Sequence, residues 1–248
     1  MIVAASTSCV PDTPLSEIFD KLADLEYASA EIVIGGREVI SPATLDSQFD
    51  AVVQLCRISR HITPVAFYLD AEPDCRGYAE MFSTLCRLAK MIKVVAVTVR
   101  ASLPGTPFNE EIDRLRDLVR LAAPHGVVVG LATESGRMTD TPETLQSFCN
   151  NVKGLGITLD PSHYIYKLQK PKDYESLLSS VTMVRLRDTT AEQFQCRVGQ
   201  GIVDFGRLIT LLYKTGYRGA LSVDLKPLPG ADTLSELRKM RFLLESSL

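Results

Sequence analysis

Residues 93–99 read Lys-Val-Val-Ala-Val-Thr-Val, which is a nearly continuous run of apolar and β-branched side chains. Such a run suits a parallel strand that is covered on both faces, because a half-exposed strand would alternate polar and apolar residues. Residues 111–121 read Glu-Ile-Asp-Arg-Leu-Arg-Asp-Leu-Val-Arg-Leu and place apolar side chains three and four positions apart, which predicts a helix with one apolar stripe. The two segments together predict a parallel strand followed by its crossover helix.

The same strand-and-helix unit recurs along the chain. Short β-branched runs, separated by about 25 to 40 residues of helical pattern, predict eight strands. They are Ile2–Ser6, Ala28–Ile34, Thr63–Leu69, Lys93–Val99, Val127–Leu131, Gly156–Asp160, Thr182–Arg187 and Ala220–Leu225. Side chains that cap helix starts are expected at Thr13, Ser41, Thr141 and Asp204. Because no low-complexity linker interrupts the units, they predict an α/β fold, one closed (β/α)8 TIM barrel that forms a single domain over residues 1–248.

The composition is that of a globular protein, with 46% hydrophobic and 23% charged residues. A formal net charge of −3 supplies no positive field for a phosphate backbone, so nucleic acid is not expected as a partner. The sequence starts without a basic segment and has no apolar run of about 18 residues, so neither a secretory signal nor a membrane span is expected. The six cysteines show no CxxC spacing, which predicts reduced, packed thiols. These features favour a cytoplasmic protein with a small-molecule substrate.

In a closed barrel of this kind the ligand site lies at the carboxyl ends of the strands. His61 and His125 precede the third and fifth expected strands, so both are expected at the opposite end. His163 follows the sixth strand in Leu159-Asp-Pro-Ser-His-Tyr164, where Asp160 ends the strand. Of the three histidines, His163 is therefore the candidate for contact with a ligand.

Several segments carry a family resemblance. They are Gly126-Val-Val-Val-Gly-Leu-Ala-Thr-Glu134, Gly154-Leu-Gly-Ile-Thr-Leu-Asp-Pro-Ser-His163, Val184-Arg-Leu-Arg-Asp188, Val198-Gly-Gln-Gly-Ile-Val-Asp-Phe205 and Gly216-Tyr-Arg-Gly-Ala-Leu-Ser-Val-Asp224. Upstream, Ser29-Ala-Glu31 adds a glutamate in the second strand. Together they resemble the xylose isomerase-like TIM barrel superfamily of sugar isomerases and epimerases, which also includes an apurinic endonuclease branch. The resemblance implies an enzyme that moves protons on small sugars.

The resemblance also implies a divalent metal held by four side chains that follow strands five to eight. The matching positions in this chain are Ala132, Asp160, Arg185 and Asp224. Alanine and arginine cannot ligate a metal. The two glutamates that trade the substrate proton in the family's epimerases correspond to Ala132 and Asp224, so one base is lost and the other is shortened. Because an error of about 1 Å at a reacting centre can cost roughly a hundredfold in rate, these departures put the ordinary epimerase chemistry in question.

Two arrangements of the site remain open. In the first, the Arg185 guanidinium takes the place of the metal's charge and pairs with Asp160 and Asp224. In the second, Glu134 lies on the same side of the chain as the lost glutamate and joins Asp160, His163 and Asp224 as a metal ligand. Such an oxygen-rich site with one imidazole suits Mn²⁺ or Mg²⁺ better than Zn²⁺.

Further cations are expected near the mouth of the barrel. Arg100, Arg187, Arg197 and Lys226 stand at or just beyond strand ends. With Arg185 they would bind a phosphate or carboxylate substituent of the ligand, unless each is simply a solvated charge at the rim. The glycines of Gly199-Gln-Gly201 would let the backbone approach such a ligand closely.

Aromatic residues near the strand ends are candidates for stacking on a sugar ring. Tyr164, Tyr166, Tyr68 and Phe67 would serve in this way, or would pack loops over the barrel. Glu31 is expected to orient neighbouring side chains, although burial would raise its pKa and qualify it as a proton carrier.

Three functions remain open. The first is an enzyme acting on a small polyol, ketose or hydroxy acid, with Asp160, His163, Asp224 and Glu134 as candidate acid or base groups, with or without a metal. The second is a sugar-binding or metabolite-binding barrel that has lost the family's chemistry. The third, an apurinic endonuclease, would need three zinc ions and more histidines than this chain has, so it is not favoured. The resemblance also implies a homodimer.

Overall fold

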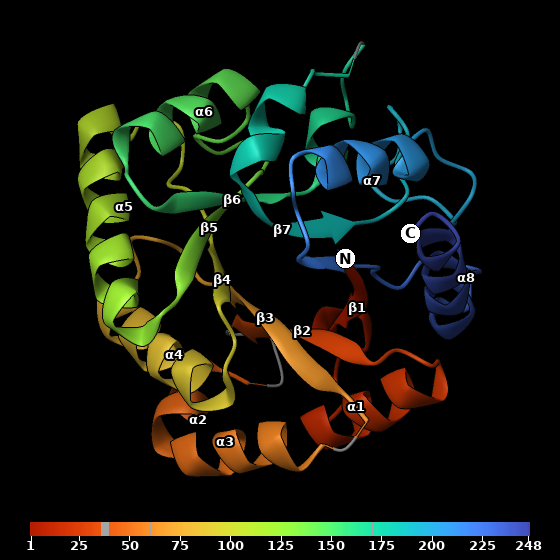
Figure 1. The fold of residues 1–248 in the computed structure, drawn as a ribbon, viewed down its shortest axis with the longest axis horizontal. Coiled ribbons are helices and arrows are strands. Elements are labelled where there is room, and N and C mark those ends of the chain that lie inside the picture. Colours follow the sequence, from red (N-terminus) through yellow and green to blue (C-terminus); the bar gives the residue numbers. More distant parts are fainter. Residues whose placement is uncertain (36–39, 60, 170) are drawn as a thin grey trace.

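The computed structural model describes residues 1–35, 40–59, 61–169 and 171–248. Eight parallel strands close into one barrel in chain order, which confirms the predicted (β/α)8 TIM barrel (Figure 1). The strands are β1 (Ile2–Ser6), β2 (Ser29–Gly35), β3 (Thr63–Asp70), β4 (Ala96–Val99), β5 (Val128–Ala132), β6 (Leu155–Leu159), β7 (Val181–Leu186) and β8 (Ala220–Val223). Strand β8 pairs with β1 and closes the barrel.

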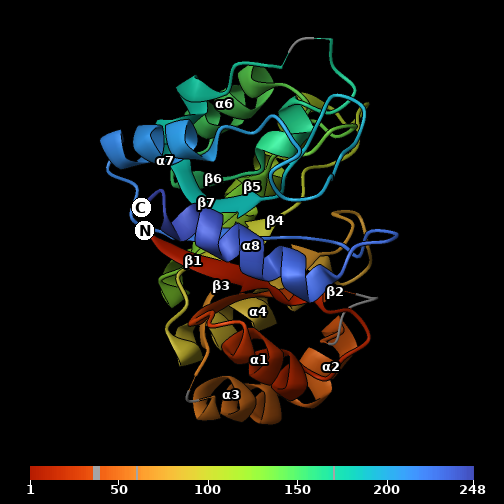
Figure 2. The same ribbon diagram turned by 90° about the vertical axis from the view of Figure 1, so that its right-hand side faces the viewer.

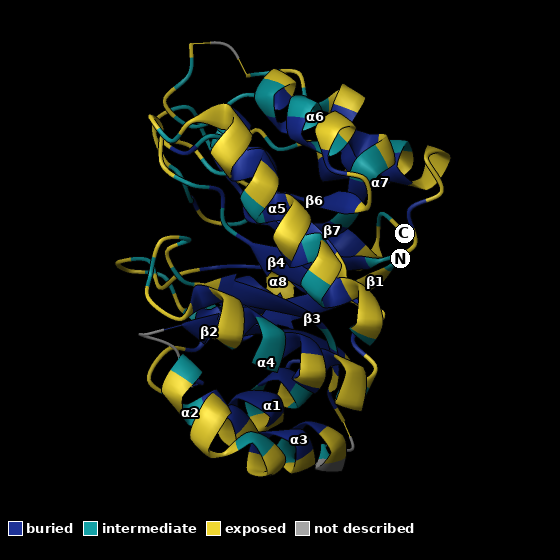
Figure 3. Ribbon diagram, turned by 90° about the vertical axis from the view of Figure 1, so that its left-hand side faces the viewer, coloured by how far each residue is buried: buried dark blue, intermediate teal, exposed yellow. Residues whose placement is uncertain are grey.

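Helices surround the barrel. The α helices are α1 (Leu15–Asp24), α2 (Pro42–Ser47), α3 (Phe49–Ile58), α4 (Tyr78–Ile92), α5 (Phe108–Ala122), α6 (Pro142–Asn151), α7 (Phe205–Lys214) and α8 (Thr233–Glu245). Short 3-10 helices are η1 (Thr7–Cys9), η2 (Ala123–His125), η3 (Pro161–Tyr164) and η4 (Glu175–Ser180). The helices turn buried faces to the strands and exposed faces outward (Figure 3). In the described part of the chain, no helix combines the length and apolarity needed to cross a membrane.

Local sequence signals account for most of the element boundaries. Ser41, Thr141 and Asp204 cap α2, α6 and α7 as predicted, each accepting a backbone N–H bond three residues ahead. The cap predicted at Thr13 is wrong, because its hydroxyl donates to the Pro11 carbonyl instead. Strand β4 starts at Ala96 rather than at residue 93, because residue 93 has a left-handed backbone with φ of 65° and ends α4.

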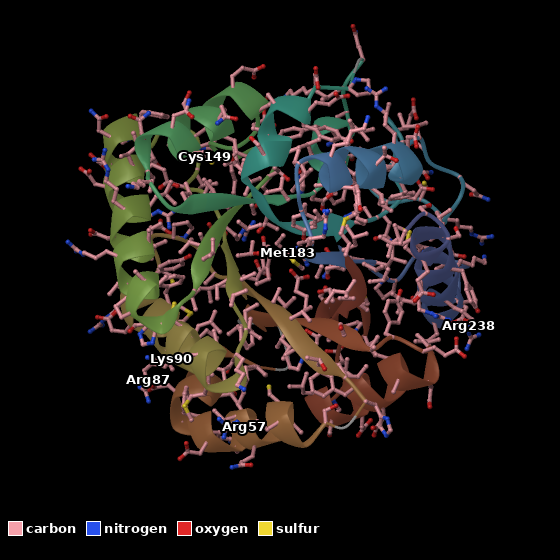
Figure 4. All side chains as sticks on the ribbon, viewed as in Figure 1. Arg57, Arg87, Lys90, Cys149, Met183 and Arg238 are labelled. Carbon is pink, nitrogen blue, oxygen red and sulfur yellow. The ribbon has the colours of Figure 1, made fainter. Side chains whose placement is uncertain are left out.

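The interior of the barrel changes from apolar to polar along its axis. At the amino end of the strands, Ala4, Ala66, Ala96 and Ala220 leave room for Met183, which lies at the centre of the ring of strands (Figure 4). One layer further along, Thr98 and Thr158 share a hydrogen bond of 2.7 Å across the interior. Both termini lie together at one end of the barrel (Figure 2). The polar layers approach the other end, where the strands finish.

Candidate active site at the carboxyl ends of the strands

The carboxyl ends of the strands enclose a cavity of about 190 Å³. Every one of the eight strands, or the segment directly after it, contributes to its lining. The residues are Ser8, Val33, Tyr68, Asp70, Arg100, Ala132, Thr133, Glu134, Thr158, Asp160, His163, Arg185, Arg187, Phe194, Asp224 and Lys226. The cavity therefore brings together most of the side chains that the sequence singled out.

Arg187 joins two aspartates at this end of the barrel. Its Nη2 donates to Asp160 Oδ2 at 2.9 Å and to Asp224 Oδ2 at 2.5 Å. The guanidinium lies over the ring of Phe194, 4.6 Å from the ring centre, and the residue is only 5% exposed. One buried cation thus sits between the two carboxylates.

Arg185 makes a second ion-pair group, one layer deeper in the barrel. Its Nε donates to Glu31 Oε2 at 3.0 Å, and its Nη2 lies 3.1 Å from Asp224 Oδ2. The predicted pairing of Arg185 with both aspartates is therefore half wrong, because the partner of Asp160 is Arg187. Both arginines point into the barrel, since they are two residues apart on one chain, and Arg187 is the one at the height of Asp160.

The ion pairs keep both aspartates ionised. Burial by itself would raise their pKa values, but the pairs with Arg185 and Arg187 outweigh it and hold the pKa of Asp160 and of Asp224 below the usual range. The second oxygen of each carboxylate is also satisfied. Asp224 Oδ1 accepts from the Ser8 hydroxyl at 2.6 Å, and Asp160 Oδ1 accepts from a backbone N–H at 3.0 Å.

His163 is held in one tautomer. Its Nδ1 accepts the backbone N–H of Ser135 at 3.1 Å, so the proton of the neutral ring is on Nε2. That Nε2 lies 3.9 Å from Asp160 Oδ2. Burial and the neighbouring Arg187 lower the pKa of His163, although Asp160 acts in the opposite direction. The side chain is therefore a neutral hydrogen-bond donor toward the cavity.

Glu134 belongs to a second network at the rim. Arg100 Nε donates to Glu134 Oε2 at 3.0 Å, and Arg137 Nε lies 3.0 Å from the same oxygen. Arg137 also donates to the Ala101 carbonyl at 2.9 Å and to Glu72 Oε1 at 2.6 Å, so it ties together the loops after β3, β4 and β5. Burial would raise the pKa of Glu134, but these two arginines lower it. Glu134 is thus an ion-paired carboxylate.

The side chains present do not fit the metal site that the resemblance implies. Each carboxylate that could serve as a ligand, at Asp160, Asp224 and Glu134, already bonds a guanidinium. Over residues 1–35, 40–59, 61–169 and 171–248, no group of three or more His, Cys, Asp or Glu side chains is placed to hold a metal ion. The alternative set that adds His163 to these three carboxylates meets the same obstacle.

Two predicted ligand contacts lie outside the cavity, and a third is at its edge. Arg197 is exposed and donates through Nη2 to the Gly230 carbonyl at 2.5 Å, so it braces the loop after β8. Tyr164 is completely buried and donates to the Thr139 carbonyl at 3.1 Å, which makes it a core residue. Lys226 lines the cavity, with its Nζ 3.8 Å from Asp224 Oδ1.

The glycines in the loop after β7 serve Asp188 rather than a ligand. The backbone N–H groups of Gly199 and Gly201 donate to Asp188 Oδ2 at 2.8 and 2.9 Å. A Cβ on Gly201 would lie 1.8 Å from Asp188 Oδ1. The loop therefore approaches a carboxylate of the protein closely, and its approach to a ligand stays a prediction.

Several residues of the site were not predicted from the sequence. Ser8 follows the first strand and could have been found by the same strand-end rule that selected Asp160. Phe194 and Arg137 lie in loops without a periodic pattern, so no local signal pointed to them. Phe67, a predicted stacking residue, is fully buried, whereas its neighbour Tyr68 lines the cavity.

Comparison with known proteins agrees with this architecture. The family model described as xylose isomerase-like TIM barrel matches residues 19–242. No curated protein matches the chain. Among solved structures, a xylose isomerase-like TIM barrel protein from Mycobacterium smegmatis in complex with magnesium has a TM-score of 0.80 at 15% identity, covering 99% of this chain and 96% of that one.

Two further solved structures are similar over nearly the whole chain. The 3-keto-D-glucoside 4-epimerase of E. coli has a TM-score of 0.77 at 14% identity, with 99% of both chains covered. The probable 3-DHS dehydratase of Bacillus anthracis has a TM-score of 0.76 at 15% identity, again with 99% of both chains covered. At these identities the similarity to solved structures shows the fold alone. The match of the family model over most of the chain shows more: this protein belongs to the xylose isomerase-like TIM barrel family.

Proposed function

We propose that the barrel mouth binds a small, neutral, polyhydroxylated carbonyl compound, such as a ketose, and moves a proton on it without a divalent ion. The observation that carries this proposal is the single Arg187 nitrogen that joins Asp160 to Asp224 beside His163. The similar structures support the kind of reaction, since they include an epimerase and a probable dehydratase. Nucleic acid has no part in this proposal.

The charges around the cavity favour a neutral ligand. Among the described residues of the lining, Arg100, Arg185 and Arg187 are each already paired with carboxylates. An anionic group would compete with these carboxylates for the guanidinium groups, and breaking a buried pair costs about 3–5 kcal/mol. A hydroxyl can instead donate to a carboxylate and accept from a guanidinium. We therefore propose a ligand rich in hydroxyl groups, rather than the phosphate or carboxylate that the number of cations suggested.

The proposed reaction uses charges that are in place before the substrate arrives. Removing a proton from the carbon next to a carbonyl puts negative charge on the carbonyl oxygen. In our proposal Asp160 accepts that proton, the electrons of the C–H bond form a carbon–carbon double bond, and the carbonyl π electrons move to the oxygen. Arg187 and the Nε2–H of His163 would stabilise this oxygen without reorganising. Return of the proton to the opposite face of the same carbon re-forms the carbonyl and completes an epimerisation. Return to the former carbonyl carbon completes an isomerisation, in which the hydroxyl on the neighbouring carbon loses its proton to the charged oxygen and becomes the new carbonyl.

A barrel that binds its ligand without turnover is the second candidate, and one observation favours it. Arginine pairs outweigh burial and hold the pKa of Asp160 and of Asp224 below the usual range. A carboxylate with a lowered pKa is a weak base, so it takes a proton from carbon slowly. The ion pairs that would stabilise the developing negative charge therefore also make Asp160 a weaker base.

Deuterium exchange distinguishes the two candidates. Proton NMR in D₂O would follow the loss of the C–H signal for a panel of ketoses, with EDTA and with added Mn²⁺. We expect exchange that EDTA does not change and that Asp160→Asn and His163→Gln abolish. His61→Gln, at the other end of the barrel, is the matched control and should retain it. Exchange that occurs only with Mn²⁺ would contradict the metal-independent reaction. Thermal stabilisation by a ketose without any exchange would support the second candidate, a barrel that binds its ligand without turnover.

A further inference from the structure

Tyr68 brings a hydroxyl to the cavity. It lies on β3, and its side chain lines the cavity although the residue is only 8% exposed. Other buried tyrosines bind their hydroxyls to backbone carbonyls of the protein, namely Tyr27, Tyr164 and Tyr217. Among the residues that the structure describes, the Tyr68 hydroxyl has no such carbonyl partner. It can therefore bond to a ligand.

Tyr68 also lies on the side of the cavity where the family's epimerases have a glutamate. It shares a small buried cluster with Val33 and Ala132. The resemblance places one of the two proton-trading glutamates at position 132, where this chain has only a methyl group. Glu134, two residues further on, is paired with Arg100. On this side of the cavity, Tyr68 is therefore a side chain that carries a proton next to the position of the lost base.

Arg185 favours release of the Tyr68 proton. Its Cζ lies 4.2 Å from the centre of the Tyr68 ring, and the two residues come from β7 and β3, which stand opposite each other in the barrel. Burial raises the pKa of Tyr68, with Glu134 and Asp70 acting in the same direction, whereas Arg185 and Arg100 lower it. The hydroxyl thus holds its proton when a substrate arrives, and the guanidinium stabilises the tyrosinate that would form.

We propose that Tyr68 is the second proton-transfer residue of an epimerisation and donates to the face of the reacting carbon opposite Asp160. Asp160 follows β6, three strands away from β3 around the barrel, so the two groups reach the cavity from different sides. A base that stays on one face returns the proton to that face, and inversion needs a donor on the other. This inference rests on the proposed function, because it adds a residue to the same reaction.

The proton transfer from Tyr68 completes the reaction that Asp160 begins. Once Asp160 has taken the proton, the Tyr68 O–H bond breaks and its proton joins the carbon from the other face. The electrons of the carbon–carbon double bond form the new C–H bond, the charged oxygen re-forms the carbonyl, and the O–H electron pair stays on the tyrosine oxygen. Asp160 then releases its proton to water and Tyr68 takes one from water, which restores both groups.

Tyr68→Phe separates proton removal from inversion, because it keeps the ring beside Arg185 and removes only the hydroxyl. The probes are D-fructose and D-tagatose in D₂O, whose C3 epimers are D-psicose and D-sorbose. Proton NMR measures both exchange at C3 and formation of the epimer. We expect the variant to form the epimer at least about 100-fold more slowly and to keep exchange within about threefold of the wild type. A purely structural role would lower both rates together.

Tyr213→Phe is the matched control, because it removes a hydroxyl from a tyrosine that is 61% exposed, and it should change neither rate. Equal losses of exchange and inversion in Tyr68→Phe, or inversion at the wild-type rate, would overturn the inference. Exchange without any epimer in the wild type would also overturn it, while the proposed function would stand. No exchange of either probe by the wild type would contradict the proposed function and the inference with it.

The wild-type product gives a second measurement that does not depend on the folding of a variant. A hydroxyl exchanges its proton rapidly with water, so in D₂O Tyr68 carries deuterium. We expect the C3 epimer to contain deuterium at C3 from the earliest turnovers. Passage of protium from C3 of the substrate to C3 of the epimer would show that a single base serves both faces, and would overturn the inference.

Discussion

Replacing Arg187 by methionine tests whether its guanidinium holds the two carboxylates together. One Nη2 atom lies 2.9 Å from Asp160 Oδ2 and 2.5 Å from Asp224 Oδ2. These two oxygens are therefore no more than about 5.4 Å apart, and without the cation two unit charges at that distance repel by about 3 kcal/mol at an effective dielectric constant of ~20. Since breaking a buried pair costs about 3–5 kcal/mol, we expect a melting temperature roughly 10 °C lower.

The decrease in the melting temperature of Arg187→Met should depend on pH. In the wild type the arginine pairs outweigh burial and lower the pKa of both aspartates, so their stabilisation is present above the ordinary value of 3.8 and is lost as the pH falls through the folded-state values. In Arg187→Met, repulsion between the two carboxylates raises the pKa of one of them, and its protonation relieves the repulsion. The difference in melting temperature should therefore be largest near pH 7 and smaller near pH 4.5.

Thermal unfolding followed by circular dichroism across this pH range provides the measurement. The matched control is Arg116→Met, which removes an exposed pair with Asp113 at 3.0 Å. Exposed pairs contribute less than about 1 kcal/mol, so this variant should melt close to the wild type at every pH. If the melting temperature of Arg187→Met falls no more than that of the control, or falls by the same amount at every pH, the Arg187 guanidinium does not hold the two carboxylates together.

Three further changes have defined outcomes. Gly201→Ala should lower the melting temperature because its Cβ would lie 1.8 Å from Asp188 Oδ1, whereas Gly206→Ala meets no atom closer than 3.7 Å and should stabilise α7 by about 0.5–1 kcal/mol. EDTA or Mn²⁺ should shift the melting temperature by less than about 1 °C, and a clear rise with Mn²⁺ would contradict the paired carboxylates. Glu31→Gln should lower the free energy of unfolding in urea by less than Arg187→Met does, because burial already raises the pKa of Glu31 and glutamine keeps an oxygen acceptor. An equal or larger decrease would contradict this prediction.

The barrel and the end that carries the site follow from local features of the chain. Apolar runs and helical stripes repeat within each unit, and caps such as Ser41 and Thr141 bond backbone groups three residues away. Their physical cause acts within a few residues, so it can be recognised without knowledge of the rest of the molecule. The rule that ligands bind at strand ends then leads directly to Asp160 and His163.

The contacts inside the site required the folded molecule. The register of β7 and β8 pairs Leu186 with Val223, and this places Arg187 beside Asp224. Tyr164 turns into the core, whereas Phe194, from a loop without a pattern, enters the cavity. Ion pairing and packing depend on the stagger between strands and on the paths of loops. Both bring together residues far apart in the sequence, and no local propensity encodes such distances.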